Sequence, residues 1–500
     1  MFKRILKTIA ALGAGHGIQT LTQFLLPPAF IAAYGVKGYG EWLVLSAAVG
    51  YLSTLDFGLQ TYVLNELTAL YHRKEMEQFH RVQSVGLWLM LFFVAAGAII
   101  AASAFALPIG DILKISPKRG AVSWTVFCLA FQILASIPMG QILGVYRTFG
   151  EAHRGVMWGN LYRIVLLGVT LILVWQKAPF WAIAACQVMT ILVVLAAALL
   201  VLRWRRPEVC PRLTYWDGAL AKKILKPSLF FSLFVVNNFL VYQAPVLMLQ
   251  RFLGAEVVVA FSVSRMLFSF VRQTTALVQQ GIAPEVTRLS GVGDKEGLIR
   301  LYVLFESVVL TVVLTVNTGL LLASPLLLKL WLKRPELFDL KLFVAVMLIS
   351  VVSSVKEYKI YYQYATNHHV RTGLVTFLTY LAMLPLSFEG IRWFGISGFT
   401  YVWLAIELLQ LALVHHHNLR FFEGREEISL RPVLRLGFLL AVMVVVTFSV
   451  GPLLESRNYL LQVLTSILTM LVLTGVSYFS FNIRQIIQAV RSQLIKLKPA

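Results

Sequence analysis

The sequence predicts an all-α integral membrane protein with about fourteen transmembrane helices. Of its 500 residues, 58% are hydrophobic and only 13% are charged, whereas a soluble domain carries about 25% charged residues. Apolar runs of roughly 20 residues, the length that crosses a bilayer, recur along the whole chain. The excess of 44 Lys and Arg over 23 Asp and Glu is typical of cytoplasmic loops beside anionic lipid, so we expect no nucleic-acid partner.

The expected spans follow one another with short connections. The first half holds 12–34, 40–65, 84–107, 121–145, 155–175 and 179–202. The second half holds 227–250, 257–283, 301–323, 341–364, 371–393, 396–417, 433–454 and 459–482. The basic N-terminal stretch continues into the first apolar run, which favours a first span over a cleaved signal.

Four regions are expected from these spans. They are an N-terminal lobe (1–202), a cytoplasmic linker (203–226), a C-terminal lobe (227–417), and two extra helices with a cytoplasmic tail (418–500). Basic residues collect in the loops on the side of the N-terminus, so both termini are expected in the cytoplasm. The two lobes look like a repeat, because laying the second span over the eighth pairs Ser46 with Arg265, Ser53 with Arg272 and Gln60 with Gln279. Such repeats place a substrate site between lobes near the midplane.

The eighth span carries the main candidate site. Two arginines, Arg265 and Arg272, fall on one helical face together with three further polar residues, Ser262, Ser269 and Gln279. A single arginine at the bilayer centre costs roughly 2.5–3.5 kcal/mol on insertion scales, so two on one face indicate a wet cavity. Guanidinium groups match phosphate oxygens and stay charged, which favours anion binding. The alternative is that both arginines neutralise Asp56 or Glu306 in ion pairs between helices.

Further polar residues at membrane depth join this prediction. On the second span, Ser53 and Gln60 share a polar stripe with Asp56. Three roles fit Asp56: a proton or sodium site, an ion-pair partner of an arginine, or a helix-end residue before Gly58. His16 is a cavity candidate that also fits a packed histidine. Lys356 and Lys359 are cavity candidates, although the tyrosines that follow them favour an interfacial aromatic belt.

Several functional classes lack their motifs. The three cysteines have no metal-like spacing and are interpreted as packing residues. The histidine runs at 368–369 and 415–417, at helix ends, are not expected to bind a metal. No phosphate-binding loop, serine elbow or zinc-spaced histidine motif is present in the sequence. We therefore expect neither an enzyme nor a bound cofactor.

The segment 34–67 contains two motifs, Y-G-x-x-x-Y-G-x-W from Tyr34 to Trp42 and L-D-F-G-L from Leu55 to Leu59. In these motifs it resembles the Wzx-type polysaccharide and O-antigen flippases of the multidrug/oligosaccharidyl-lipid/polysaccharide (MOP) exporter superfamily. The resemblance implies a bundle like that of the MATE transporters, with two six-helix lobes, plus two extra helices. The stripe on the second span departs from the family pattern, because it holds serine and aspartate in place of basic residues.

The resemblance also implies a function. The chain would move an undecaprenyl-diphosphate-linked oligosaccharide to the outer leaflet of the bacterial or archaeal inner membrane, for cell-surface polysaccharide such as lipopolysaccharide. The arginines of the eighth span would hold the diphosphate, Asp56 would take up H⁺ or Na⁺, and polysaccharide-assembly proteins would be partners. The alternatives are a multidrug or organic-cation antiporter of the same superfamily and a membrane glycan polymerase or ligase.

Overall fold

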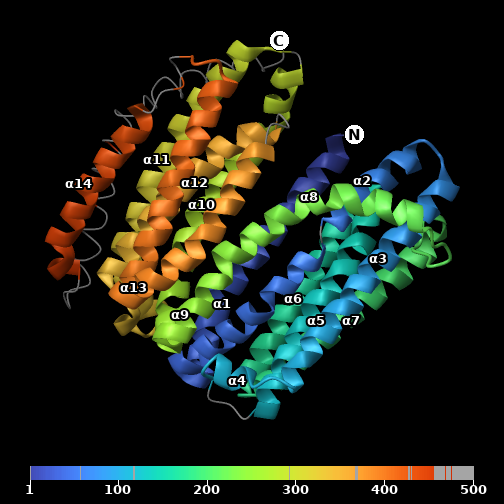
Figure 1. Cartoon of the computed structure of the whole chain (residues 1–500), viewed down its shortest axis with the longest axis horizontal. Helices are drawn as coiled ribbons and strands as arrows, with labels where there is room; N and C mark the ends of the chain where they lie inside the picture. The colour runs from blue at the N-terminus through green and yellow to red at the C-terminus, as the bar shows by residue number, and fades with distance from the viewer. Residues whose placement is uncertain are drawn as a thin grey trace. The chain divides into compact units, whose positions relative to one another are not determined.

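In the computed structural model the described residues form helices and turns, with no β-strand among them (Figure 1). The structure describes residues 2–56, 58–115, 119–291, 293–365, 370–425 and 431–454, with the single positions 428, 468 and 475. The chain separates into two compact units, 1–259 and 260–500. The lobe boundaries expected from the sequence stay a prediction, and the expected last span (459–482) lies outside the described residues apart from two positions.

Most expected spans coincide with helices of the structure. The helices of the first unit are α1 (Phe2–Val49), α2 (Leu59–His72), α3 (Met76–Ala102), the short α4 (Ile109–Ile112), α5 (Arg119–Gly144), α6 (Ala152–Trp175), α7 (Phe180–Arg205), α8 (Gly218–Tyr242) and α9 (Ala244–Leu253). The expected span 227–250 is divided between α8 and α9. The helices of the second unit are α11 (Lys295–Leu327), α12 (Leu340–Ala365), α13 (Val370–Phe421) and α14 (Arg431–Leu454). α10 (Ala255–Gly291) begins in the first unit and continues into the second. Six helices within the described residues meet the length and hydropathy of a bilayer span, taken alone.

Two long helices each run through a loop that the sequence predicts between two spans: α13 contains both expected spans, and α1 contains one and the beginning of the next. The backbone is non-helical at Gly35 in α1 (φ 74°) and at Gly395 in α13 (φ 58°). Both glycines adopt positive φ, which costs a residue without a Cβ little. Each break lies at or beside the loop that the sequence predicts, so α1 and α13 are each a pair of helices joined by a tight turn.

The expected span 40–65 is not one helix. After α1 ends at Val49, the chain makes a 3₁₀ segment (Gly50–Asp56) and resumes at α2 from Leu59, with Gly58 at φ 69°. A single helical face from Ser46 to Gln60 therefore does not exist, because the 3₁₀ segment and the glycine change the angle between successive side chains. The stripe expected on this span is corrected accordingly.

The core of the first unit centres on α5, which contacts α1, α2, α3, α6 and α7. Small residues let the backbones approach: a Cβ on Gly155 of α6 would lie 2.2 Å from the backbone carbonyl oxygen of Leu143 in α5. Glycines at helix contacts are typical of membrane proteins, where close backbone packing replaces the hydrophobic effect. By contrast, α6 and α7 expose large apolar side chains, among them Trp175 and Trp204 near their ends, as expected of a lipid-facing surface.

The segment between α7 and α8 is bound to α3. Three α3 side chains donate hydrogen bonds to its backbone carbonyls: Gln83 to Val209 at 3.0 Å, Ser84 to Arg212 at 2.6 Å and Trp88 to Leu213 at 3.2 Å. α8 then begins at an aspartate N-cap, and it packs on α2 and α3. The expected linker is thus an ordered part of the first unit.

The second unit is built around α12, which contacts both α11 and α13, while α14 packs on α11. α10 joins α12 through the Ser350 hydroxyl, which donates to the carbonyl of Phe268 at 3.0 Å. Within α13, a Cβ on Gly398 would lie 1.9 Å from the carbonyl oxygen of Gly390. The two halves of α13 therefore meet backbone to backbone next to the break at Gly395. This arrangement brings polar residues of α10, α11, α12 and α13 together.

Candidate functional site

The polar residues of the second unit converge on the sequence Lys356-Glu357-Tyr358-Lys359 of α12. Successive residues of a helix point about 100° apart, so adjacent charges face different neighbours. Lys356 faces α13, Glu357 faces α10 and Lys359 faces α11. One turn of α12 therefore makes three separate ion pairs with three helices.

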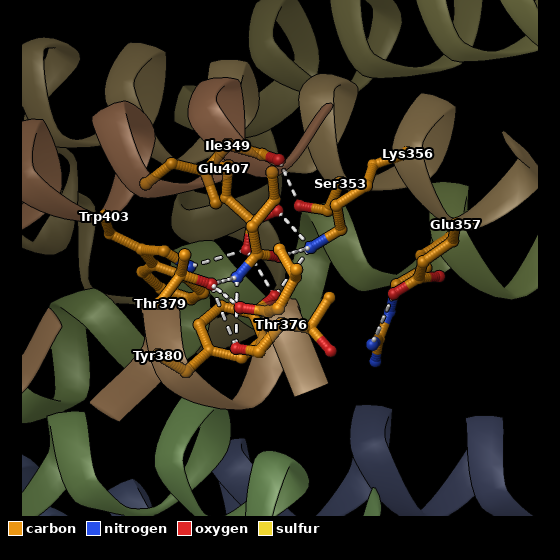
Figure 2. A network of polar contacts seen from close by, with 12 residues as sticks. Ile349, Ser353, Lys356, Glu357, Thr376, Thr379, Tyr380, Trp403 and Glu407 are labelled. Atoms are coloured by element: carbon orange, nitrogen blue, oxygen red, sulfur yellow. Dashed lines mark hydrogen bonds and ion pairs between the residues drawn. The ribbon is translucent and has the colours of Figure 1, made fainter. Parts of the chain in front are cut away.

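The ammonium of Lys356 is fully bonded to α13 (Figure 2). It donates to the Glu407 carboxylate at 2.6 Å, to the Tyr380 hydroxyl at 2.6 Å and to the Gln410 side-chain oxygen at 2.7 Å. Glu407 also accepts from the Tyr380 hydroxyl at 2.8 Å and from the Trp403 indole at 3.1 Å. The lysine and glutamate side chains are 4% and 1% exposed. A buried pair persists only when its hydrogen-bonding groups are satisfied in this way.

Lys359 makes a similar pair with α11. Its ammonium donates to the Glu306 carboxylate and, at 2.8 Å, to the Tyr302 hydroxyl. The Tyr358 hydroxyl donates to the carbonyl of Tyr302 at 2.6 Å. Tyr358 and Tyr362 are fully buried together with Tyr302 of α11, so these two tyrosines of α12 do not belong to an interfacial aromatic belt. These rings instead cover the buried pair.

Both lysines are thus engaged inside the protein in this structure and do not line an open cavity wall. Their assignment as substrate ligands stays a prediction, and it would require them to leave Glu407 and Glu306. The alternative for the arginines, ion pairs between helices, is met in part: Arg272 pairs with Glu357 of α12, although not with the expected Glu306, which is held by Lys359. Asp56 accepts from the backbone N–H of Gln60 at 3.4 Å, and its pairing with either arginine stays a prediction.

Arg272 differs from the lysines because its ion pair is partly exposed and not buried. A guanidinium nitrogen lies 3.4 Å from a carboxylate oxygen of Glu357, and the two side chains are 32% and 35% exposed. Figure 2 shows Glu357 to one side of the cluster around Lys356. An ion pair at this distance with both partners accessible contributes little to stability. Arg272 therefore presents its charge at an accessible position on α10.

The other residues of the α10 stripe follow the same face. The Arg265 guanidinium lies over the Phe261 ring, 5.2 Å from its centre, and Ser269 donates to the carbonyl of Met266 at 2.7 Å. The Ser262 hydroxyl and the Gln279 amide nitrogen are buried without a hydrogen-bond partner among the described residues. Arg265 lies seven residues before Arg272, which is about 10 Å of helix rise. Two extended guanidinium side chains can converge across that distance.

The candidates of the first unit are dispersed. His16 is exposed on α1, and the Ser53 hydroxyl donates to the carbonyl of Gly50 at 2.7 Å. Gln60 packs against Gly140 of α5. Asp56 ends the 3₁₀ segment and bonds the first turn of α2, which matches the helix-end alternative among the three left open for it. The structure does not assemble these four residues around one point.

The motif Tyr34–Trp42 has a packing role in the structure. Phe30 and Trp42 stack with ring centres 5.2 Å apart, and the Tyr34 hydroxyl donates to the carbonyl of Ala178 at 2.6 Å. These rings surround the turn at Gly35. The same segment borders a cavity of about 320 Å³ within the first unit, lined mainly by apolar groups with the buried carboxyl-bearing residue Glu41 among them.

Sequence reasoning missed the pairing of the charges. Glu357 and Glu407 stand out as ionisable residues at membrane depth, yet nothing in the sequence states which lysine or arginine each one meets. The signal that could have helped is the adjacency of Lys356 and Glu357. Neighbouring opposite charges on a helix cannot satisfy each other across 100° and need partners on other helices.

The fold matches solved membrane transporters, although no family model matches the chain and no curated protein matches it by sequence. An inward-facing multidrug resistance MATE family transporter of the MOP superfamily superimposes with TM-score 0.65 at 13% identity, covering 81% of this chain and 96% of that one. The lipid II flippase MurJ in an inward closed conformation gives TM-score 0.67 at 11% identity, covering 95% and 99%.

A third structure, a MOP superfamily transporter from Pyrococcus furiosus described as having a binding pocket of reversed polarity, gives TM-score 0.58 at 15% identity, covering 86% of this chain and 96% of that one. The chain therefore has the helical fold of membrane transporters. In particular, it is the fold shared by the MATE transporters and MurJ of the MOP superfamily, and the expected fold class is confirmed.

Proposed function

We propose that this chain is a flippase for a lipid-linked oligosaccharide, which it carries as the undecaprenyl diphosphate from the cytoplasmic to the outer leaflet of the inner membrane. The observation that carries the proposal is the pair of arginines on one face of α10, with the charge of Arg272 accessible. The structural similarity to a lipid II flippase supports it at the level of the fold.

The physical reason is desolvation. A diphosphate headgroup that crosses about 30 Å of hydrocarbon loses its hydration, which is prohibitive without compensating partners. Guanidinium groups can replace that hydration with charge-assisted, bidentate hydrogen bonds. The hydroxyl of Ser262 and the amide nitrogen of Gln279, which have no hydrogen-bond partner among the described residues, lie on the same stripe. The lipid tail stays in the bilayer, and alternating access exposes the headgroup to each side in turn.

The test replaces each arginine by alanine in cells whose chromosomal copy carries the variant. Losing a hydrogen bond to a charged group costs about 1.5–3 kcal/mol, so Arg265→Ala and Arg272→Ala should each lower surface glycan roughly tenfold to a hundredfold. The matched control is Arg300→Ala, which removes an exposed arginine of α11. Membrane levels of all variants are measured by immunoblot. Normal export by the Arg265→Ala/Arg272→Ala double variant would exclude the proposal.

The second candidate function is an organic-cation antiporter. It is favoured by the largely apolar cavity beside Glu41 in the first unit, whose wall includes the rings of Tyr34 and Phe180. Aromatic rings and a carboxylate together attract lipophilic cations. Drug-resistance profiles of the same strains separate the two functions, because an antiporter would raise resistance to cationic dyes and leave surface glycan unchanged.

A further inference from the structure

The accessible ion pair between α10 and α12 has a consequence for substrate affinity. Glu357 of α12 forms an ion pair with Arg272, with its carboxylate oxygen 3.4 Å from the guanidinium and both side chains about one-third exposed. The two other pairs of the same helix turn are buried, and both lysines donate further hydrogen bonds to neighbouring side chains. Only the Arg272–Glu357 pair of these three is therefore accessible to a competing anion.

We propose that Glu357 is an internal competitor of the substrate, a carboxylate that occupies the guanidinium of Arg272 until a diphosphate displaces it. The inference rests on the proposed function. A carboxylate and a phosphate accept the same forked hydrogen bonds from arginine, so they compete for one group. The diphosphate carries more charge and more acceptor oxygens than Glu357, and it wins when the headgroup is present.

Once the diphosphate has displaced it from Arg272, the Glu357 carboxylate lowers the stability of the protein–diphosphate complex. Its other nearby cations along α12 are committed, because Lys356 is held by Glu407 and Lys359 by Glu306. A displaced Glu357 therefore stays close to the bound diphosphate with its negative charge, and like charges at short distance repel. Glu357 thus lowers affinity and speeds release of the headgroup, which makes it a specificity-determining residue that sets how tightly Arg272 holds its ligand.

The test measures binding of inorganic pyrophosphate to the purified full-length protein in nanodiscs at low salt. Glu357→Gln keeps the size of the side chain and removes the competing charge, so it should bind pyrophosphate about fivefold more tightly, which is about 1 kcal/mol. Glu357→Asp retains the charge and should bind like the wild type. In cells, Glu357→Gln should export less glycan despite its higher affinity, a combination that simple misfolding does not produce.

The matched control is Glu336→Gln. Glu336 forms an exposed pair with Arg334 at 3.3 Å in the same unit, away from the α10 stripe, and its loss should leave pyrophosphate affinity unchanged. If Arg272→Ala binds pyrophosphate as well as the wild type, the diphosphate site itself is wrong. If Arg272→Ala loses binding but Glu357→Gln binds no more tightly than the wild type, only the competition is wrong and the proposed function stands.

Discussion

At the scale of single residues, burial separates charges that hold the protein together from a charge available to a ligand. Lys356 and Arg272 both meet a carboxylate, but the first pair is almost fully enclosed and the second is open. Enclosed pairs resist separation, because removing one partner leaves a buried charge uncompensated. Accessible pairs exchange partners at little cost. The number of charges at membrane depth therefore says less about function than their exposure.

The enclosed pair gives a prediction on stability. Lys356→Met removes the ammonium and leaves Glu407 buried with only neutral donors, which should lower the free energy of unfolding by about 3–5 kcal/mol. The Lys356→Met/Glu407→Gln double variant has no charge at this position and should recover most of the loss. Thermal unfolding in detergent, followed by tryptophan fluorescence, measures both. Equal destabilisation of the single and double variants would contradict this view of the pair.

At the scale of elements, helices are predictable from the sequence, whereas their breaks and partners are not. The spans that became α3, α5, α6 and α7 coincide with apolar runs, because every backbone group in lipid must be satisfied within a helix. The prediction of one continuous helix over 40–65 was wrong, because hydropathy does not detect the turn at Gly58. Helical periodicity predicted the α10 stripe, but it reports only the direction of a side chain on its own helix. The partner of Arg272 depends on packing between helices, which no local pattern encodes.

The close approach within α13 gives a prediction at this scale. Gly398→Ala places a Cβ against the carbonyl of Gly390, where the built position lies only 1.9 Å away, so the hairpin at Gly395 must open. Overpacking of this kind costs about 1–3 kcal/mol. Gly168→Ala in α6 is the control, since nothing lies within 4 Å of the added methyl. A thermal midpoint of Gly398→Ala equal to that of the control would show that the two halves of α13 are not in contact.

At the scale of the whole molecule, the chain consists of two compact units whose division falls inside α10. The formal net charge of +21 is distributed mainly over loops, and the loops on the N-terminal side are the more basic. Cytoplasmic loops of membrane proteins show this excess because positive segments resist translocation. The sequence therefore predicts the orientation of the chain.

Reporter fusions check that orientation. Green fluorescent protein fused to the C-terminus should fluoresce, and alkaline phosphatase at the same position should be inactive, since both termini are expected in the cytoplasm. A phosphatase fusion placed in the 108–118 segment should be active, because that segment belongs to the opposite side. Active phosphatase at the C-terminus would contradict the predicted orientation.

The enclosed lysine–glutamate pairs also bear on how such a protein diverges. A mutation at Glu407 or Lys356 alone strands a charge in the interior, while a simultaneous change at both positions leaves a neutral, packable core. Drift through single steps is therefore blocked at these sites, and descendants of one ancestor should carry either both charges or neither. Glu357 is free of that constraint and can vary as the cargo varies.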